Sequence, residues 1–418
     1  MTLPRAVIVL VLAVWVSAAA AAPPAWIAAW ATSMQSGTAY PRSPIALLDQ
    51  QTVRERVRVS LAGARIRLRL SNEFGTEALH IGAATVAHPV DRATVAPGSI
   101  RDVTFDGRAA ATIPPGAAFV SDAIEFPVTP GQEISISLYF PGRASPATLH
   151  EISLKRAVVS PHGDMTHADT IAGGTTTTSA IGVSAVLVPV SSSSRLVVAL
   201  GDSITDGVGS TLDADRGWPS DLARRLAQVA PCDNVAVVNA GIAGNRLLAD
   251  CLMVSLGCSG VNALARFDRD VLALPGVTHV IVAEGINDLG FPGARVDGGY
   301  LAGPALAPST DDVIAAYRQL IERAHAHGVR ALGATLTPFE GVDMEGYYSP
   351  AKETARQTIN AWIRTSGAFD GVVDFDAVLR DPAHPSRILP RFASKDHLHP
   401  NDEGYQAMAD AIDVALFA

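Results

Sequence analysis

The chain has 418 residues, a formal net charge of −9, and 48% hydrophobic and 17% charged residues. This composition is that of a globular protein and excludes a fibrous or largely disordered chain. Because the sequence contains no sustained basic run, nothing favours binding to nucleic acid or to an anionic membrane surface. The length exceeds that of an ordinary single domain, so we expect two domains.

The first 22 residues have the pattern of a secretory signal peptide. One arginine, Arg5, precedes an apolar run from Ala6 to Val16, and a series of alanines follows. The run is short for a membrane span, and the small residues offer a cleavage site near residues 20–22. We therefore expect a secreted or periplasmic protein without stable membrane insertion. An uncleaved membrane anchor is the less favoured alternative.

The sequence contains three cysteines, Cys232, Cys251 and Cys258. In an oxidising compartment we expect a disulfide between Cys251 and Cys258, which lie seven positions apart around a turn that contains Gly257. Cys232 is then left over. No zinc-binding spacing of cysteines and histidines is present, so we expect no metal site.

Residues 23–190 are predicted to form an antiparallel β-sandwich domain of the jelly-roll-like type. In residues 52–61 and 64–70, charged and aliphatic side chains alternate, which is typical of strands buried on one side. The arginines of this stretch, Arg54 to Arg69, are interpreted as a solvent-facing strand face rather than as an anion site. The domain could bind carbohydrate, cap one side of an active site, or stabilise its neighbour. Further strands are expected at 79–87, 100–105, 123–128, 133–140, 152–159 and 182–188.

A run of four serines, residues 191–194, is expected to link this domain to a second one at 195–418. In the second domain, strand and helix patterns alternate, which predicts a parallel sheet covered by helices on both faces. Ligands of such folds bind beyond the carboxyl ends of the strands. Strands are expected at 195–201, 235–239, 279–283, 330–335 and 371–375, and helices at 218–229, 260–274, 311–327, 350–366 and 401–416. Thr310 to Asp312 is the predicted start of the third helix and Gly328 its end.

A serine follows the first of these strands. The apolar run from Val197 stops at Gly201-Asp202-Ser203, and Gly201 allows a sharp turn at the strand end. A serine in this position, with a free backbone N–H, suits an acyl-transfer nucleophile. The alternative is an ordinary strand-to-helix turn, in which Gly, Asp and Ser are common.

Three further segments carry the groups that such a nucleophile needs. Asp396 lies three residues before His399, so its carboxylate can hold Nδ1 of the imidazole and leave Nε2 for Ser203. Gly244 and Asn287 each follow an apolar run, and could offer a backbone and a side-chain N–H to the developing oxyanion.

These four motifs, in this order, resemble the SGNH, or GDSL, hydrolase superfamily over roughly the C-terminal half of the chain. The sequences of residues 241–246 and 284–288 also resemble those of a branch of secreted esterases of polysaccharide-degrading bacteria. The resemblance implies a three-layer, flavodoxin-like domain with a five-stranded parallel sheet. It assigns Ser203, Asp396 and His399 as catalytic residues, and Ser203, Gly244 and Asn287 as the oxyanion hole. Asp202, Asp206 and Asn245 lie beside the motifs and are interpreted as supporting residues.

We therefore expect a secreted serine esterase that needs no cofactor, forms a covalent acyl-enzyme and removes small acyl groups such as acetyl from carbohydrate. A lipase, lysophospholipase or arylesterase would use the same residues on longer acyl or aryl esters. A non-catalytic carbohydrate-binding protein belongs to a different class, and the presence of all five catalytic positions argues against it. The sequence indicates no particular oligomeric state.

Overall fold

The structure is a computed structural model that describes residues 25–37, 47–144, 147–189, 194–229, 234–250 and 260–417. The expected signal peptide, most of the serine run and all three cysteines lie outside these ranges. Export, the Cys251–Cys258 disulfide and the two-domain boundary therefore stay predictions.

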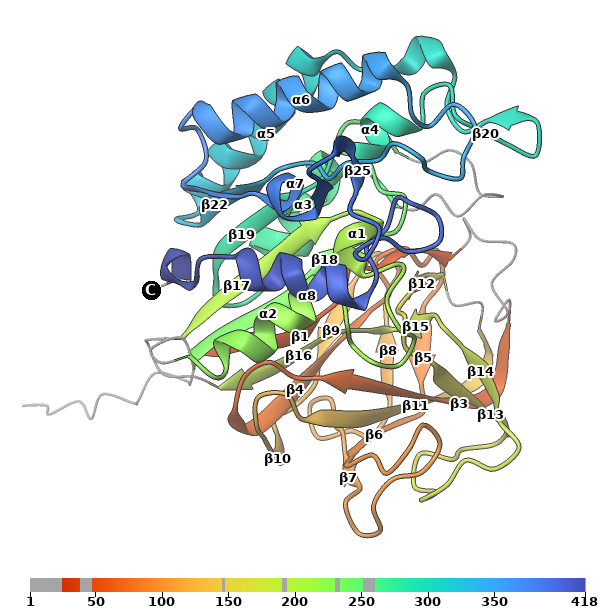
Figure 1. The fold of residues 1–418 in the computed structure, drawn as a ribbon. Coiled ribbons are helices and arrows are strands. Elements are labelled where there is room, and N and C mark those ends of the chain that lie inside the picture. Colours follow the sequence, from red (N-terminus) through yellow and green to blue (C-terminus); the bar gives the residue numbers. More distant parts are fainter. Residues whose placement is uncertain are drawn as a thin grey trace, which may run out of the picture.

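The C-terminal region is organised around a five-stranded parallel sheet (Figure 1). Its spatial order is β18-β17-β19-β22-β23, so the first strand along the chain lies second in the sheet, as in flavodoxin-like folds. The interior strand β17 is almost wholly buried because helices cover both faces of the sheet. The strands are β17 (Arg195–Gly201), β18 (Val235–Gly241), β19 (Val277–Ala283), β22 (Arg330–Ala334) and β23 (Gly371–Val373).

Figure 1 shows α5 (Thr310–Ala326) and α6 (Pro350–Thr365) on one side of this sheet, and α2 (Trp218–Leu226) and α8 (Asp402–Ala411) on the other. Helix α5 is capped by Ser309, whose side chain accepts a hydrogen bond from the Asp312 N–H while the Asp312 carboxylate accepts one from Ser309. The start signal predicted at Thr310 to Asp312 lies at this helix end, with Ser309 as the N-cap residue. The shorter elements are α1 (Ser203–Asp206), α3 (Ala263–Phe267) with a π-helical turn (Asp268–Leu272), α4 (Ile286–Gly290), α7 (Phe375–Leu379), 3-10 turns (Pro304–Leu306 and Val414–Phe417), β20 (Arg295–Val296), β21 (Gly299–Tyr300), β24 (Arg380–Asp381) and β25 (His384–Ile388).

The N-terminal region is rich in β-strands, and all its strand pairs are antiparallel. One sheet has the order β1-β16-β4-β10 with β9 beside β4, and a second has the order β14-β13-β3-β11-β6-β7. Smaller sheets are β15-β12-β2 and β5-β8. A jelly-roll connection of these sheets stays a prediction. The strands are β1 (Trp26–Ala31), β2 (Gln35–Ser36), β3 (Leu48–Arg58), β4 (Gly63–Ser71), β5 (Leu79–Ile81), β6 (Ala83–Ala87), β7 (Arg101–Asp102), β8 (Ala111–Ile113), β9 (Ala118–Val120), β10 (Ile124–Val128), β11 (Glu133–Ala144), β12 (Thr148–His150), β13 (Ala157–His162), β14 (Thr175–Thr177), β15 (Ala180–Ile181) and β16 (Val183–Pro189).

The β-rich region packs against the edge of the parallel sheet, where β1 contacts β18. The Ser60 hydroxyl joins the two regions, because it donates to the Ala29 carbonyl at 2.7 Å and accepts from the Val237 N–H at 3.2 Å. Strand β18 would otherwise present an open edge, so β1 protects it from pairing with other chains.

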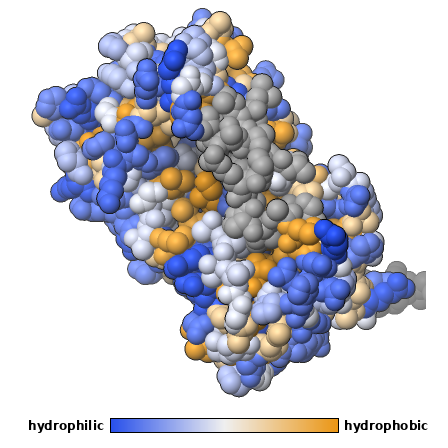
Figure 2. Space-filling view, turned by 90° about the vertical axis from the view of Figure 1, so that its right-hand side faces the viewer, coloured by the Kyte–Doolittle hydropathy of each residue, from blue (hydrophilic) through white to orange (hydrophobic). Residues whose placement is uncertain are grey.

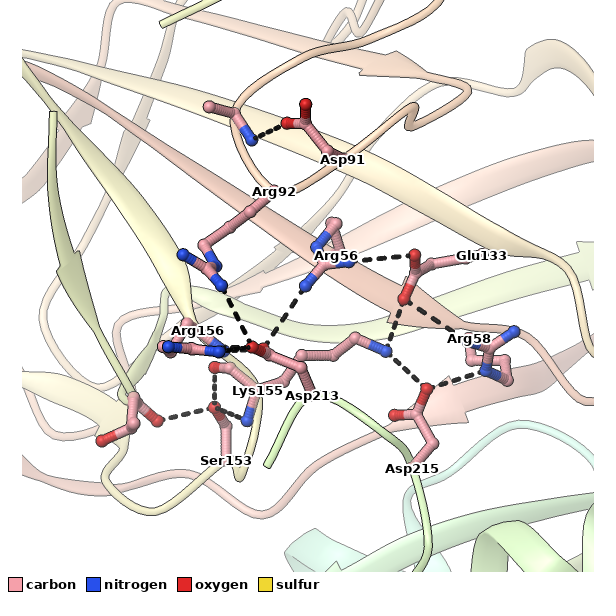
Figure 3. A network of polar contacts seen from close by, with 12 residues as sticks. Arg56, Arg58, Asp91, Arg92, Glu133, Ser153, Lys155, Arg156, Asp213 and Asp215 are labelled. Atoms are coloured by element: carbon pink, nitrogen blue, oxygen red, sulfur yellow. Dashed lines mark hydrogen bonds and ion pairs between the residues drawn. The ribbon is translucent and has the colours of Figure 1, made fainter. Parts of the chain in front are cut away.

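A network of ion pairs also joins the two regions (Figure 3). Asp213 and Asp215, in the loop between α1 and α2, point toward basic side chains of the β-rich region. Asp213 lies 2.5 Å from Arg156 and 3.3 Å from both Arg56 and Arg92. Asp215 lies 2.7 Å from Arg58 and 2.5 Å from Lys155. Both aspartates have left-handed backbone, with φ of 66° and 52°, which these contacts help to stabilise.

For Arg54 and Arg56, the structure corrects the interpretation of the strand arginines as a solvent-facing strand face. The side chain of Arg56 is only 12% exposed because it faces Asp213 and Glu133. Arg54 is 1% exposed and donates to the carbonyl oxygens of Ala93 and Ala168. These side chains bind carboxylates and carbonyls that lie far away in the sequence.

Hydrophilic residues predominate on the face of the molecule seen in Figure 2, and apolar residues form small patches among them. Within the described ranges, no helix combines the length and the apolar character needed to cross a membrane.

We predict that Asp213→Ala lowers the free energy of unfolding by about 2 kcal/mol, because it leaves the partly buried Arg56, Arg92 and Arg156 without their shared carboxylate. Thermal and guanidinium unfolding would measure the effect. Asp268→Ala is the matched control, since Asp268 forms a 2.6 Å pair with Arg323 but is 72% exposed. Equal effects of the two substitutions would show that the network adds nothing to stability.

Candidate active site

The candidate site begins at the turn between β17 and α1. Gly201 ends the strand, and a Cβ at this position would lie 2.5 Å from the Ala283 carbonyl oxygen, so only glycine fits. Asp202 caps α1, because its Oδ1 accepts the Ile204 N–H at 2.9 Å. Ser203 is the first residue of the helix, so its backbone N–H has no acceptor within the helix. Its side chain is almost buried, with 6% of the residue exposed.

The structure brings Ser203, His399 and Asp396 into one hydrogen-bonded series. Ser203 Oγ lies 2.7 Å from His399 Nε2, and His399 Nδ1 lies 2.6 Å from Asp396 Oδ2. A carboxylate only accepts hydrogen bonds, so Nδ1 carries the hydrogen and Nε2 presents its lone pair to the serine hydroxyl. This is the arrangement of a nucleophile, a base and a group that orients the base.

Asp396 is held by its own loop. Its Oδ1 accepts hydrogen bonds from the Ser394 hydroxyl at 2.7 Å and from the N–H groups of Leu398 and His399 at 3.0 Å each. Partial burial raises the pKa of Asp396, but the hydrogen bonds and the charge of His399 outweigh it and keep the pKa well below its usual range. Asp396 therefore stays a carboxylate that can stabilise an imidazolium.

Gly244 and Asn287 follow the two strands that flank β17. In the sheet register, Gly201 pairs with Gly241 on one side and with Ala283 on the other, so the three following loops start side by side. Gly244 has φ of +76°, and its N–H donates no hydrogen bond to another described residue. These loops leave backbone and amide donors at the same edge of the sheet as Ser203.

The orientation of the Asn287 amide is fixed by two hydrogen bonds. Nδ2 donates to the Asn245 carbonyl at 2.9 Å, and Oδ1 accepts from the Tyr347 hydroxyl at 2.7 Å. Because an amide nitrogen carries two hydrogens, one remains for a ligand. Tyr347 reaches Asn287 from 60 residues further along the chain. Its position beneath Asn287 carries no signal in the sequence.

Buried polar side chains fix the loop around Gly244. The Asp288 carboxylate accepts the N–H groups of Leu247 at 2.7 Å and Leu248 at 3.0 Å. Arg266, which is fully buried, donates to Asn245 Oδ1 at 2.9 Å and to the Gly201 carbonyl at 2.9 Å. Asn245 thus links this loop to Arg266. Sequence analysis missed Arg266 and Asp288, although Asp288 directly follows Asn287 in the motif.

Asp206 lies between the candidate site and the β-rich region. Its Oδ2 accepts the Ala243 N–H at 3.1 Å, next to Gly244, and its Oδ1 lies 3.0 Å from His150 Nε2. His150 ends β12 and is 2% exposed. Asp206 therefore contacts His150 of the β-rich region as well as the loop of Gly244. No local sequence pattern indicates the contact with His150.

Two further carboxyl groups lie buried near the serine turn. Glu284 is 0% exposed, and neither of its carboxyl oxygens has a hydrogen-bond partner among the described residues. Burial and the nearby Asp202 raise the pKa of Glu284 well above its ordinary value, and burial raises the pKa of Asp202 to about 7. Burial therefore favours the protonated form of Glu284. In the described part of the chain, no group of three or more His, Cys, Asp or Glu side chains is arranged to hold a metal ion.

The chain belongs to the GDSL-like lipase/acylhydrolase family, whose model matches residues 199–407. The matched region contains the hydrogen-bonded series and the three loops described above. The protein is therefore a carboxylic ester hydrolase.

Solved structures similar to this chain include a lipolytic protein of the G-D-S-L family from Desulfitobacterium hafniense, with 22% identity over 52% of this chain and 96% of that one and a TM-score of 0.37. A GDSL-like lipase from Bacteroides thetaiotaomicron has 19% identity over 55% of this chain and 90% of its own, with a TM-score of 0.37. An acetylxylan esterase from Geobacillus stearothermophilus has 22% identity over 53% of this chain and 93% of its own, with a TM-score of 0.39. A search of curated proteins found no match.

We predict that Glu284→Gln stabilises the protein increasingly as the pH rises from 5 to 8. Above the ordinary carboxyl pKa of 4.5, folded Glu284 keeps a proton that the unfolded chain has lost, so rising pH destabilises the wild type. The amide of the Glu284→Gln variant does not titrate, so the variant does not lose stability in this way as the pH rises. Thermal unfolding should show a melting temperature a few degrees above the wild type at pH 8 and a smaller difference at pH 5.

The matched control is Glu322→Gln, since Glu322 is exposed on α5. A difference between Glu284→Gln and the wild type that stays constant with pH would contradict the neutral state of Glu284.

Proposed function

We propose that the protein is a secreted serine esterase that acts through a covalent acyl-enzyme and removes small acyl groups, above all acetyl, from carbohydrate. The hydrogen-bonded series of Ser203, His399 and Asp396 carries this proposal, because it joins a nucleophile to a correctly oriented base. Export is proposed from the signal-like N-terminal segment. The division into domains at 23–190 and 195–418, with the linker 191–194, is part of the same proposal.

In the first step, His399 Nε2 takes the proton of Ser203 Oγ as the oxygen attacks the ester carbonyl carbon. The electron pair of the carbonyl double bond moves to its oxygen, and Asp396 stabilises the imidazolium. The Ser203 and Gly244 N–H groups and the Asn287 amide donate to this oxyanion. A single donor of this kind is worth about 10²–10³ in kcat.

The tetrahedral intermediate then collapses. The bond to the alcohol oxygen breaks, and the His399 imidazolium protonates the departing alcohol. A water molecule next attacks the acyl-serine, with His399 again as the base. The acid leaves and Ser203 recovers its proton, so the two half-reactions use the same groups in opposite directions.

A groove of about 620 Å³ beside the loop of His399 supports a hydroxyl-rich alcohol portion of the substrate. Lys395 and His397, both exposed, line it from the loop that carries Asp396 and His399. These two side chains can hydrogen-bond the hydroxyl groups of a glycan, while Ile388, Pro390 and Ala393 add apolar wall to the same groove. The residues that face this loop across the groove are Glu340, Asp381, His384 and Arg387.

We predict that Ser203→Ala lowers kcat by at least about 10⁴-fold and leaves thermal unfolding unchanged, and that His399→Ala is nearly as severe, because the residues act as one unit. A fluorophosphonate probe should label Ser203 in the wild type. Labelling of another serine, together with undiminished turnover by Ser203→Ala, would refute this mechanism.

We predict that acetyl esters are hydrolysed with a higher kcat/KM than octanoyl or longer esters, and that acetylated xylan or another acetylated glycan releases acetate. The measurement is a panel of p-nitrophenyl esters from acetate to palmitate beside these glycans. Lys395→Ala should raise KM for acetylated oligosaccharides and leave p-nitrophenyl acetate unaffected. Faster turnover of long chains would favour a lipase, and turnover of aryl esters alone would favour an arylesterase.

A further inference from the structure

We propose that His150, a residue of the β-rich N-terminal region, is a positioning residue for the oxyanion side of the active site. It holds Asp206, and Asp206 holds the backbone beside Gly244. This inference rests on the function proposed above, in which the Gly244 N–H binds the oxyanion. It gives the N-terminal region a part in catalysis that requires no contact with substrate.

The contacts form a continuous path across the two regions. His150 is buried at the end of β12, and its Nδ1 lies 2.9 Å from the Ser33 carbonyl oxygen. Its Nε2 lies 3.0 Å from Asp206 Oδ1. The other carboxylate oxygen, Oδ2, accepts the Ala243 N–H at 3.1 Å. One carboxylate thus connects a β-rich-region side chain to the peptide unit next to Gly244.

The geometry assigns two hydrogens to the His150 ring. Nδ1 faces a carbonyl oxygen, and Nε2 faces the Asp206 carboxylate and the Ile152 carbonyl oxygen at 3.2 Å. All three partners only accept, so both ring nitrogens must donate. His150 is therefore an imidazolium, and its bond to Asp206 is a buried ion pair.

Electrostatics agrees with this assignment. Burial lowers the pKa of His150, but the charge of Asp206 and the hydrogen bonds to acceptors outweigh burial and raise the pKa above its ordinary 6.5. Among the described residues, Glu55 on β3 also faces His150, and burial raises the pKa of Glu55 to about 8. Asp206 thus supplies the charge that keeps His150 protonated.

Close packing transmits the position of Asp206 to both sides of the site. Asp206 is the last residue of α1, three residues after Ser203. A Cβ on Gly241 would lie 2.7 Å from Asp206 Cα, so the helix touches the end of β18. The Asn239 amide also donates to the Thr205 carbonyl at 2.9 Å. A shift of Asp206 would therefore move the nucleophile and the oxyanion loop relative to each other.

The test compares His150→Gln with the wild type on p-nitrophenyl acetate. Glutamine is neutral and cannot form the ion pair with Asp206, so the loop of Gly244 is held less firmly. Because this loop binds the oxyanion only in the transition state, we expect kcat to fall about 10- to 100-fold while KM changes less than about twofold. Affinity for a trifluoromethyl ketone, which forms a tetrahedral adduct, should fall by a similar factor. If His150 had no positioning role, its replacement would change neither kcat nor the affinity for the trifluoromethyl ketone.

The pH profile provides a second readout. The ion pair exists below the folded pKa of His150 and is lost as the pH rises through it, so wild-type kcat should decline reversibly on the alkaline side while tryptophan fluorescence shows an intact fold. His150→Gln should lack this decline. Asp206→Asn should reproduce the low kcat, and the double variant should be no worse than either single one. Asp206→Asn and the wild-type profile test the proposal even where His150→Gln does not fold.

The matched control is His167→Gln, because His167 Nε2 lies 2.8 Å from Asp102 Oδ1 but both side chains are exposed. It should behave as the wild type. Wild-type kcat in His150→Gln with a lowered melting temperature alone would overturn the proposal and leave His150 a structural residue. Failure of the proposed function would appear separately, as full turnover by Ser203→Ala.

Discussion

The in-register ends of three parallel strands are the constraint on which the candidate site depends. Gly201 lies level with Gly241 and with Ala283, so the loops after β17, β18 and β19 leave the sheet at the same height. Glycine is required at the first two positions, because added side-chain atoms would collide with Ala283 and with Asp206. The close approach of the backbone here brings the loops that carry Ser203, Gly244 and Asn287 to the same edge of the sheet.

Buried polar side chains then give these loops a single arrangement. Arg266 donates to carbonyl groups at the ends of β17 and β18 and to Asn245, so it ties two strands to the loop of Gly244. Such a group is costly to bury unless all its donors find partners, and that requirement selects one geometry. Glu284 illustrates another solution: neither of its carboxyl oxygens has a hydrogen-bond partner among the described residues, and burial favours its protonated form.

Sequence analysis predicted the elements that depend on local patterns. Strand β17 was predicted at its observed bounds because its apolar run is uninterrupted and ends at a glycine. Strand β1 was not predicted, since Trp26–Ala31 is uniformly apolar and shows no alternation. Sequence analysis could not predict the ion-pair partners of Arg56 or the contact between His150 and Asp206. The residues involved are distant in sequence and share no periodicity. Motifs identify reacting groups, whereas the groups that position them come from the tertiary structure.

The ion-pair network between the two regions has a consequence for exchanging parts of the protein. The loop with Asp213 and Asp215 belongs to the catalytic region, yet the side chains that neutralise it belong to the β-rich region. A chimera that joins this catalytic region to a foreign N-terminal region would leave two carboxylates and the edge of β18 without partners. The segment matched by the family is therefore not a portable module in this protein, and grafting it requires the acidic loop and the β18 edge to be redesigned together.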